Sequence, residues 1–351
     1  MTRNTNPKNI IPLPLKEVIG SIRTCLYEST YCTYSSADIA TALVTAAIQN
    51  KSPNTVANRP DSDTVFERIY EGLNMDNLES LIKTQRPPKG TNIKLLLDGH
   101  NNGFWGKDAL GIIRTKPKNG TNKAFGYLVG FSNTEPKGIV AIQELFSGSV
   151  TTDSIEMIEE LRKDYVIDLL VADGEFYKAE FVEYLNHAKI PFIIRRTNTG
   201  NIRELGIKYT KPHLYETVVE RPTGKKICLR YWIYRYKGID DDFFLTSNMK
   251  NGSKTIRKLF KTRWNIETGF REVNRVGIKT TTRDFLVRLF FYVISCMVYN
   301  MWRKIRFRYG MFAVRLDDIV VQVKAYIKWL MLSASDILAV RRRRCIRLRI
   351  I

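Results

Sequence analysis

The sequence predicts an α/β fold, in which a mixed sheet flanked by helices carries a β-rich insertion and lies between helical N- and C-terminal regions. Three observations predict this class. Short apolar runs alternate with capped helices from residue 93 to residue 197, β-rich segments follow at about 200–248, and helical periodicity prevails before residue 84 and after residue 252. At 351 residues the chain is long enough for two domains or for one elaborated α/β domain.

The charge of the chain is its most unusual bulk property. Lys and Arg number 56 against 35 Asp and Glu, a net charge of +21, whereas the 44% of hydrophobic residues is ordinary for a folded protein. The segment 251–351 alone holds 23 basic and six acidic residues. This balance predicts a polyanionic partner, nucleic acid or an anionic membrane surface, which meets the C-terminal part most closely.

Cysteine usage and the start of the chain predict a cytoplasmic protein. The five cysteines form no close pair, and the first residues contain no apolar signal segment. The apolar stretch 285–302 is interrupted by Arg288, which leaves a run of about 14 residues. A bilayer needs roughly 20. We therefore expect a buried core helix here and no membrane partner.

Residues 1–88 are predicted to form a helical region that serves DNA binding or dimerisation. Apolar residues at helical spacing follow polar caps at 35–49 and 61–73. The helix at 64–73 allows two interpretations: it reads a DNA groove in a helix-turn-helix, or it packs against its neighbours. Its charges, Glu67 and Glu71 against Arg68, favour packing. The Pro/Gly/basic segment 83–92 is a predicted linker.

Residues 89–305 are predicted to form the α/β core. The expected strands are 93–99, 124–133, 138–146, 165–177 and 190–197, with helices at 151–164 and 178–189. Segments 214–220, 225–237 and 242–248 predict an inserted sheet, followed by helices at 254–276 and about 283–303. Residues 306–351 are predicted to be a basic helical region, with a helix near 316–332 and a terminal charge run at 341–351 suited to nonspecific phosphate attraction.

Two of the predicted strands lead to an aspartate. Asp98 stands in "NIKLLLDGHNNG" and Asp173 in "ADGEFY". If these strands are neighbours, the two carboxylates lie close enough to share hard cations such as Mg²⁺, which proteins hold through one or two carboxylates. Aspartates after strands also cap helices and make turns, and Glu175 competes for the second position.

A third acid comes from "FKTRWNIETGFREVNR", residues 260–275. Arg263, Glu267 and Arg271 fall along one side of the predicted helix, which on its own is ordinary for a salt-bridged solvent face. Nearby aromatic residues instead place Glu267 at the edge of a buried surface. Paired arginines there would keep the acid ionised and hold DNA phosphates beside it. The aromatic residues are Phe260, Trp264 and Phe270.

This segment carries a resemblance to a known family. Read at the spacing of a Tyr-Arg-Glu-Lys signature, the positions hold Phe260, Arg263, Glu267 and Asn274, in the setting "RWNIETGF". Together with the Asp-x-x-Phe-Tyr pattern at Asp173, these residues make the chain resemble the DDE transposases of prokaryotic insertion sequences, in the branch with that signature. Phe and Asn depart from its Tyr and Lys, so the phosphate contacts of those two positions are not carried over.

The resemblance implies an RNase H-like catalytic core and a transposase. Such an enzyme binds the ends of its mobile element, cleaves DNA strands and joins the 3′-hydroxyl to target DNA, as a homodimer on DNA and in association with the nucleoid. Asp98, Asp173 and Glu267 are implied as catalytic residues and as ligands of two Mg²⁺ ions, for which Mn²⁺ can substitute. Two alternatives stay open: an RNase H-like nuclease without strand transfer, and an inactive DNA-binding remnant.

Several basic residues are expected to contact DNA. The helix supplies Arg263, Arg271 and Arg275, and the end of the last core strand supplies Arg195 and Arg196. General surface charge explains the last two about as well. His100, two residues after Asp98, is placed to touch a water or phosphate, although a histidine in a turn is more often simply exposed.

Overall fold

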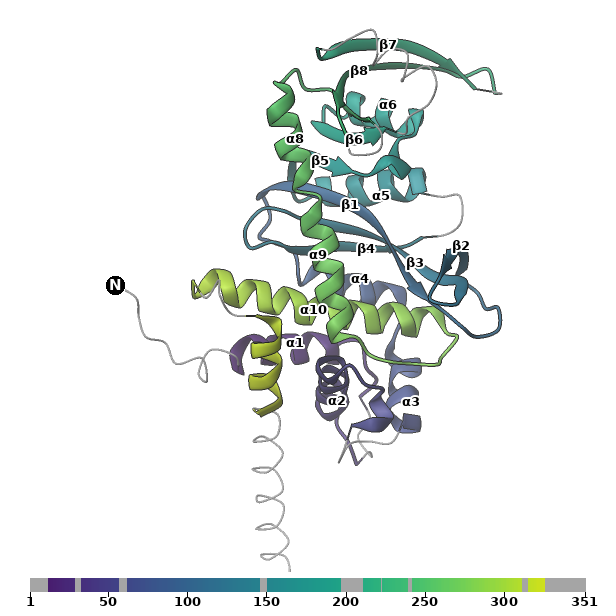
Figure 1. The fold of residues 1–351 in the computed structure, drawn as a ribbon. Coiled ribbons are helices and arrows are strands. Elements are labelled where there is room, and N and C mark those ends of the chain that lie inside the picture. Colours follow the sequence, from purple (N-terminus) through teal and green to yellow (C-terminus); the bar gives the residue numbers. More distant parts are fainter. Residues whose placement is uncertain are drawn as a thin grey trace, which may run out of the picture. The chain divides into compact units, whose positions relative to one another are not determined.

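The computed structural model describes residues 12–28, 33–56, 62–145, 150–196, 211–221, 223–238, 242–310 and 315–325 (Figure 1). The chain divides into two compact units. Unit 1 comprises 1–81, 272–282 and 286–351, and unit 2 comprises 82–271 and 283–285. Of the predicted last helix, residues 316–325 are helical. The basic run at 341–351 lies outside the described residues.

Unit 2 is built on a mixed sheet. Within the described residues this sheet has nine strands, in the order β2-β3-β1-β5-β6-β9-β8-β7, with β4 paired to β3. The strands are β1 (Asn92–Gly103), β2 (Ile112–Lys118), β3 (Thr121–Ser132), β4 (Gly138–Glu144), β5 (Val166–Ala172), β6 (Phe192–Arg196), β7 (His213–Glu220), β8 (Lys226–Tyr236) and β9 (Phe243–Ser247).

Strand β1 lies between β3 and β5 in this sheet. It pairs antiparallel with β3 on one side and parallel with β5 on the other, and β5 in turn runs parallel to β6. The run Leu95–Leu97 is fully buried because both faces of the sheet are covered here. The first and fourth predicted strands are therefore neighbours, as the sequence analysis assumed.

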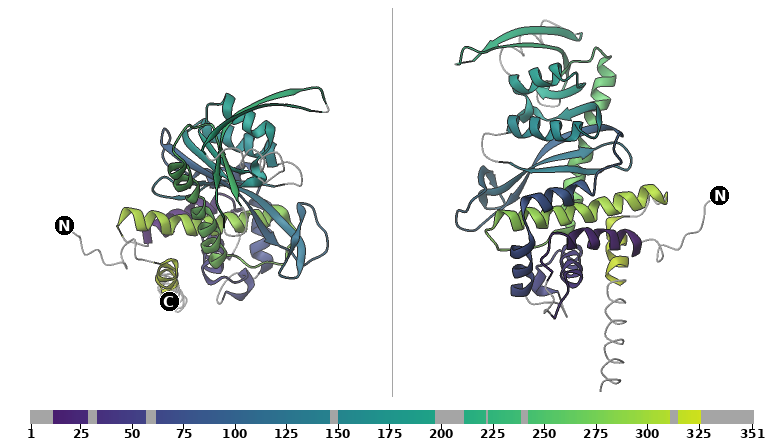
Figure 2. Two further views of the ribbon diagram at one scale, coloured as in Figure 1. Left: turned by 45° about the horizontal axis from the view of Figure 1, so that its top comes forward. Right: turned by 180° about the vertical axis from the view of Figure 1, so that it is seen from behind.

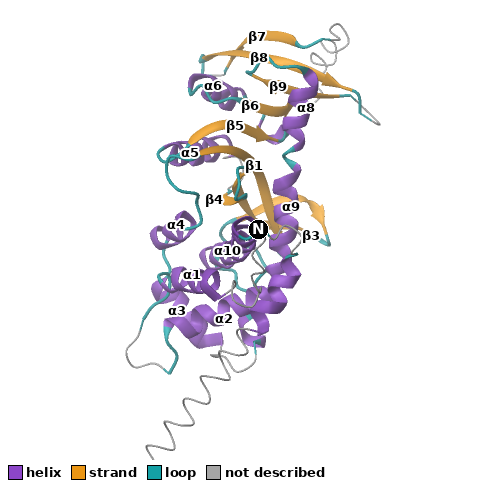
Figure 3. Cartoon of the chain, turned by 90° about the vertical axis from the view of Figure 1, so that its left-hand side faces the viewer, coloured by secondary structure: helices purple, strands orange, loops and turns teal. Residues whose placement is uncertain are grey.

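Helices cover both faces of the sheet. Figure 3 shows α5 (Val150–Arg162) and α6 (Ala179–His187) on one side of the strands and α8 (Ser253–Lys261) and α9 (Trp264–Val273) on the other. The core contains Leu95, Leu170, Phe181 and Phe192, each 0–1% exposed. Each such side chain contributes about 1.5–3 kcal/mol through the apolar surface that it removes from water. Burial of this kind holds β1, β5 and β6 in fixed register.

Two strands differ from the prediction. Strand β1 continues to Gly103, four residues beyond the predicted end at 99, because its pairing with β3 goes on after its pairing with β5 has ended. Strand β2 was missed because four of its seven residues are exposed and three are charged. An Asn119-Gly120 turn joins it to β3, and both residues have positive φ angles, 52° and 82°. Asn-Gly is the expected sequence for such a hairpin turn, so the signal was present.

The insertion and the long helix also differ from the prediction. Strands β7, β8 and β9 do not form a separate sheet, because β9 pairs antiparallel with β6 and extends the main sheet. The predicted helix 254–276 is divided into α8, α9 and the 3-10 turn η4 (Asn274–Val276). At the first division, the N–H groups of Thr262 and Arg263 donate to the carbonyls of Leu259 and Phe260 at 3-10 spacing.

Unit 1 is helical in the part of it that the structure describes. It contains α1 (Pro12–Arg23), α2 (Ser36–Gln49), η2 (Pro53–Thr55), α3 (Ser62–Gly72), most of α4 (Met75–Lys83), and α10 (Phe285–Arg308). Figure 2 shows the N-terminal helices in purple and α10 in yellow-green. On α3, Arg68 is 2% exposed and donates to the carbonyls of Tyr27 at 3.1 Å and Tyr34 at 3.4 Å. These bonds within the unit favour packing over groove reading for this helix.

Helix α10 is long and apolar enough to cross a membrane by length and composition. Of its apolar window, however, 89% is buried inside the structure, which is also what the core helix of a soluble protein shows. Arg288, which interrupts the apolar sequence, is 7% exposed and donates to the carbonyls of Thr282 at 2.6 Å and Thr280 at 3.2 Å. These hydrogen bonds explain how a charged side chain is accommodated in this helix.

Candidate active site

The two strand aspartates lie side by side in the sheet. Leu97 on β1 is the register partner of Ala172 on β5, and this is the last pair of the parallel ladder. Asp98 and Asp173 are the next residues on the two chains. Asp98 is therefore not at the end of its strand, as the sequence suggested, but at the point where β5 stops beside it.

Helix α9 brings the third acid to these aspartates through Arg263. A guanidinium nitrogen of Arg263 lies 2.6 Å from Oε1 of Glu267, an i,i+4 ion pair. The other terminal nitrogen lies 3.4 Å from Oδ2 of Asp98 and 3.8 Å from Oδ2 of Asp173. The arginine side chain is 11% exposed, so these contacts are shielded from bulk water. One cation thus joins all three acids predicted from the sequence.

The pKa of Asp98 is governed first by its burial. Burial raises the pKa of Asp98 to about 7, the Arg263 guanidinium opposes that rise, and the carboxylates of Glu175 and Asp173 add to it. The N–H of Gly99 donates to Oδ1 of Asp98 at 3.0 Å and stabilises the ionised form. The effect of burial on Asp98 therefore outweighs that of the single guanidinium.

The donor set fits a hard divalent cation. Carboxylate oxygens from Asp98, Asp173 and Glu267 are the ligand type that Mg²⁺ and Mn²⁺ prefer. Among the described residues, no group of three His, Cys, Asp or Glu side chains is arranged around a common point as metal ligands. The three acids instead contact Arg263, whose guanidinium stands between their carboxylates. The oxygen ligands that a hard cation needs are therefore present in the residues.

Glu175 remains close to the site. A Cβ atom added at Gly99 would lie 3.2 Å from its Oε1, which places this carboxylate beside β1. Loss of hydration and the neighbouring Asp173 charge raise the pKa of Glu175. The ion pair with Arg263 involves Asp173, however, and this contact favours Asp173 as the second acid.

His100 is buried rather than exposed in a turn. It lies on β1, is 8% exposed, and its ring centroid is 4.7 Å from that of Phe270 on α9. Burial lowers the pKa of His100 to about 4, so the imidazole is neutral at physiological pH. The sequence did not reveal this because the contact joins residues far apart in the chain.

The predicted DNA-contacting arginines occupy different environments. Arg195 on β6 and Arg271 on α9 are exposed. Arg196 donates to the hydroxyls of Tyr177, at 2.7 Å, and Tyr231, and lies over the Tyr177 ring at 4.5 Å. Arg275, in unit 1, forms ion pairs with two carboxylates. Its partners are Glu272, at 3.1 Å, and Asp317.

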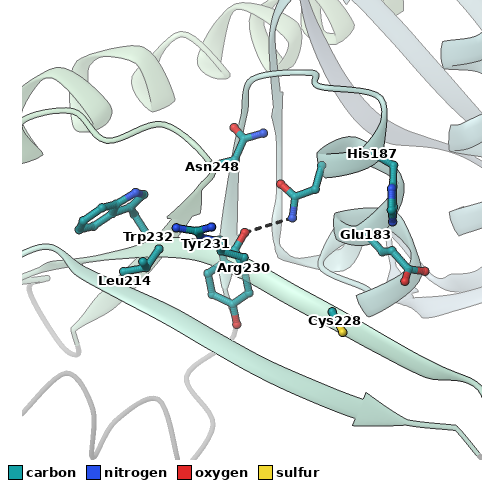
Figure 4. A pocket seen from close by; sticks show the side chains of 9 residues that line it. Glu183, His187, Leu214, Cys228, Arg230, Tyr231, Trp232 and Asn248 are labelled. Carbon is teal, nitrogen blue, oxygen red and sulfur yellow. Dashed lines mark hydrogen bonds between the residues drawn. The ribbon is translucent and has the colours of Figure 1, made fainter.

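A pocket separate from the acids lies between α6 and the inserted strands (Figure 4). Its volume is about 530 Å³. The sequence analysis did not predict it, because it combines residues from four parts of the chain. Its lining residues are Glu183, Asn186, His187, Leu214, Cys228, Arg230, Tyr231, Trp232 and Asn248.

Comparison with known proteins shows two similarities of this chain. Residues 150–301 match a family model described as "Transposase DDE domain", a stretch that includes Asp173 and Glu267. None of the curated proteins matches the chain. Among solved structures, the piggyBac transposase synaptic complex with hairpin DNA matches with a TM-score of 0.57 and 11% identity, over 93% of this chain and 77% of that one.

The structural match concerns the fold. Together with the strand order of unit 2, it confirms the RNase H-like α/β architecture that the sequence predicts. The family match reaches the second and third acids independently of that architecture. The predicted resemblance of this chain to the DDE-type transposases is thereby confirmed.

Proposed function

We propose that the protein is a DNA transposase that binds the ends of its mobile element, cleaves DNA strands there and joins the freed 3′-hydroxyl to target DNA. The observation that supports this proposal is the convergence of Asp98, Asp173 and Glu267 on one guanidinium. Three carboxylates contributed by β1, the end of β5 and α9 suit the RNase H-like architecture, and the net charge of +21 suits DNA.

In this proposal the three acids hold two Mg²⁺ ions. When bound, such a pair activates a water or hydroxyl and stabilises the leaving oxygen of an in-line phosphodiester displacement. Asp98 is held rigidly by strand pairing on one side and by the Gly99 N–H. Arg263 orients Glu267 through their 2.6 Å ion pair and supplies positive charge for a DNA phosphate close to the acids.

Binding of DNA is expected to involve exposed arginines from both predicted groups, those on the helix that carries Glu267 and those at the end of β6. Arg271 follows Glu267 by four residues, and Arg195 is exposed at the end of β6. We propose that the protein acts as a homodimer on paired element ends, on DNA in the cytoplasm. Light scattering of the protein with and without end DNA measures this assembly, and a monomer in both conditions contradicts it.

The proposal is tested with labelled DNA carrying the element ends that flank the gene, incubated with Mg²⁺ or Mn²⁺. Wild type is expected to cut at the element ends. Glu267→Gln is expected to abolish cutting and to retain DNA binding, because the charge needed for a metal ligand is lost while the size is kept. Glu156→Gln, which removes an exposed carboxylate of α5, is the matched control and is expected to cut normally.

The products separate the alternatives. Joined molecules, in which an element 3′ end is linked to target DNA, support a transposase. Defined cuts without any joined product indicate an RNase H-like nuclease instead. Binding without cutting in either metal indicates an inactive remnant, and unchanged cutting by Glu267→Gln removes this acid from the mechanism.

A further inference from the structure

A continuous exposed ridge runs along α8 and α9 and was not recognised in the sequence. Its basic residues on α8 have the spacing of three and four that places them on one helix face. Every member is exposed. We call this surface the basic ridge and define it by Lys254, Arg257, Lys258, Lys261, Trp264 and Arg271.

The ridge continues across the division between the two helices. Lys261, Trp264, Thr268 and Arg271 follow one another at spacings of three, four and three, and all four are exposed. The opposite side is buried: Ile256 on α8 and Ile266 on α9 are both 0% exposed. Figure 1 shows α8 and α9 following one another end to end. The two helices therefore present one surface rather than two.

The lysines of the ridge are not neutralised within the protein. Among the described residues, Lys254, Lys258 and Lys261 form no ion pair with a carboxylate, whereas Lys83 and Lys123 do. Arg257 is held at 5.5 Å over the Tyr236 ring and 5.9 Å over the Phe243 ring, so its aromatic neighbours fix it without cancelling its charge. Such a surface matches a row of negative charges outside the molecule.

The part of the ridge on α9 adjoins Arg263 and Glu267 in the sequence. Trp264 directly follows Arg263 and precedes Glu267 by three residues, one helical turn. Trp264 is 62% exposed, which is an unusually high exposure for a tryptophan. A basic row that includes an exposed aromatic ring is a combination that binds nucleic acid, because phosphates meet the cations and a base meets the ring.

We propose that the basic ridge binds consecutive phosphates of the DNA strand that leads into the active site, with Trp264 stacked against a nucleotide next to the scissile phosphate. The assignment of DNA as the occupant rests on the proposed function. The ridge itself rests on spacing, exposure, absence of carboxylate partners in the described structure, and adjacency to Glu267.

The test measures binding alone, so that it does not depend on cleavage. Fluorescein-labelled duplex DNA is titrated in chelator with the Glu267→Gln protein, at salt concentrations between about 50 and 200 mM. Adding Lys254→Ala, Lys258→Ala and Lys261→Ala is expected to reduce the slope of log affinity against log salt by about 2 to 3. Each lost phosphate contact accounts for about 0.9 of that slope.

The matched control removes three exposed lysines elsewhere in unit 2, Lys94, Lys163 and Lys226, and so changes the net charge equally. Its slope is expected to change by less than about 1. Equal changes in the two triple variants, no change in the ridge variant, or no DNA binding by the parent protein would each overturn the proposal. Failure to cut element ends, measured separately, bears on the proposed function and leaves this result standing.

The aromatic residue of the ridge, Trp264, has its own readout. With a duplex that carries an unpaired 3′ extension, Trp264→Ala is expected to weaken binding about tenfold, the effect of losing one base stack, while Trp264→Phe retains most of the affinity. Equal losses in the two variants would show that the indole has only a packing role. Circular dichroism of both variants confirms that α8 and α9 remain folded.

Discussion

Arg263 is the residue on which the candidate site depends most directly. Its guanidinium is within 3.8 Å of carboxylate oxygens from Asp98, Asp173 and Glu267. Burial raises the pKa of Asp98 to about 7, Arg263 opposes that rise, and the carboxylates of Glu175 and Asp173 add to it. Arg263, which the sequence predicts to contact DNA phosphates, thus also contacts all three acids.

The first residue-scale prediction concerns metal binding. Asp98→Asn is expected to lower Mn²⁺ affinity at least tenfold. An amide is a weaker ligand than a carboxylate, and Asp173 and Glu267 would be left to hold the ion without a third carboxylate. Electron paramagnetic resonance of free Mn²⁺ measures the change without DNA or turnover. Asp168→Asn, at an exposed position of β5, serves as the control and should bind Mn²⁺ as wild type does. Equal affinity in the two variants would remove Asp98 from the ligand set.

A second residue-scale prediction concerns pH. Burial raises the pKa of Glu144 to about 7, and the negative charge of Asp153 adds to the effect. The folded pKa lies above the unfolded value, so the protonated form is favoured by folding. Stability linked to Glu144 is therefore present in full below about pH 4.5 and is lost as the pH rises through about 7.

Glu144→Gln is accordingly expected to raise the free energy of unfolding by roughly 1 to 2 kcal/mol near pH 8, allowing for solvent screening of this partly exposed group. Near pH 4.5 and below, the variant and wild type should differ little. Urea unfolding at both pH values measures the difference, and comparison of the two proteins cancels the titration of other groups. A gain that does not depend on pH would contradict the assigned cause.

The roles of individual residues were predictable where a motif carried them. The spacing of Arg263 and Glu267 and the pattern at Asp173 pointed to these residues directly. The burial of His100 was not predictable, because Phe270 meets it from a helix 170 residues later in the chain. The basic ridge was missed because the exposed side of segment 254–276 is defined by the buried positions Ile256 and Ile266, which only the fold shows.

At the scale of single elements, the start of α2 offers a clear prediction. The Ser35 hydroxyl accepts from the N–H of Asp38 at 3.3 Å, and the Asp38 carboxylate accepts from the N–H of Ser35 at 2.9 Å, a reciprocal capping box. Ser35→Ala should therefore lower the stability of unit 1 by about 1 kcal/mol. Urea unfolding followed by circular dichroism measures the loss.

The control for this cap is Ser35→Asp, which restores a side-chain acceptor for the same N–H group. It should retain more of the wild-type stability than Ser35→Ala does. If the two variants were equally destabilised, the hydroxyl would act through another contact. Asp38→Ala removes the other half of the box and should cost a comparable amount.

The types of most elements followed from local pattern, whereas their ends depended on partners. Buried runs and capped helices predicted β1, β5, α5 and α6 because each buries its own apolar face. The extension of β1 to Gly103 required knowledge that β3 accompanies it beyond β5. The division between α8 and α9 was likewise not predictable, because the sequence has no Pro or Gly at Thr262.

At the scale of the whole molecule, unit 1 is assembled from separate parts of the chain. The N–H of Lys279 donates to the carbonyl of Lys51 at 3.1 Å, and the rings of Phe66 and Phe291 lie 6.2 Å apart. The N-terminal helices thus share a core with segments that follow unit 2. The predicted core at 89–305 includes the segment of α10, since contacts across more than 200 residues leave no local signal in the sequence.

We predict that a chain ending at Arg271 loses the fold of unit 1. Removal of η4 and α10 exposes apolar side chains of α2 and α3 that these segments cover. Hydrogen exchange should show strong protection of α2 in the full chain and little in the shortened one. Protection of α2 that survives the truncation would show that the N-terminal helices fold on their own. The strands of unit 2 provide an internal reference in both samples.

The route of the chain through the inserted strands has an evolutionary consequence. Strand β9 returns beside β6, the strand from which the insertion departs, and β8 and β7 are added outward from it. The chain therefore re-enters α8 from the same sheet position whatever the length of the outer strands. Outer hairpins of different size or sequence can replace one another there while the three acids stay in place. Descendants of such a protein are free to change this edge of the sheet without moving β1, β5 or α9.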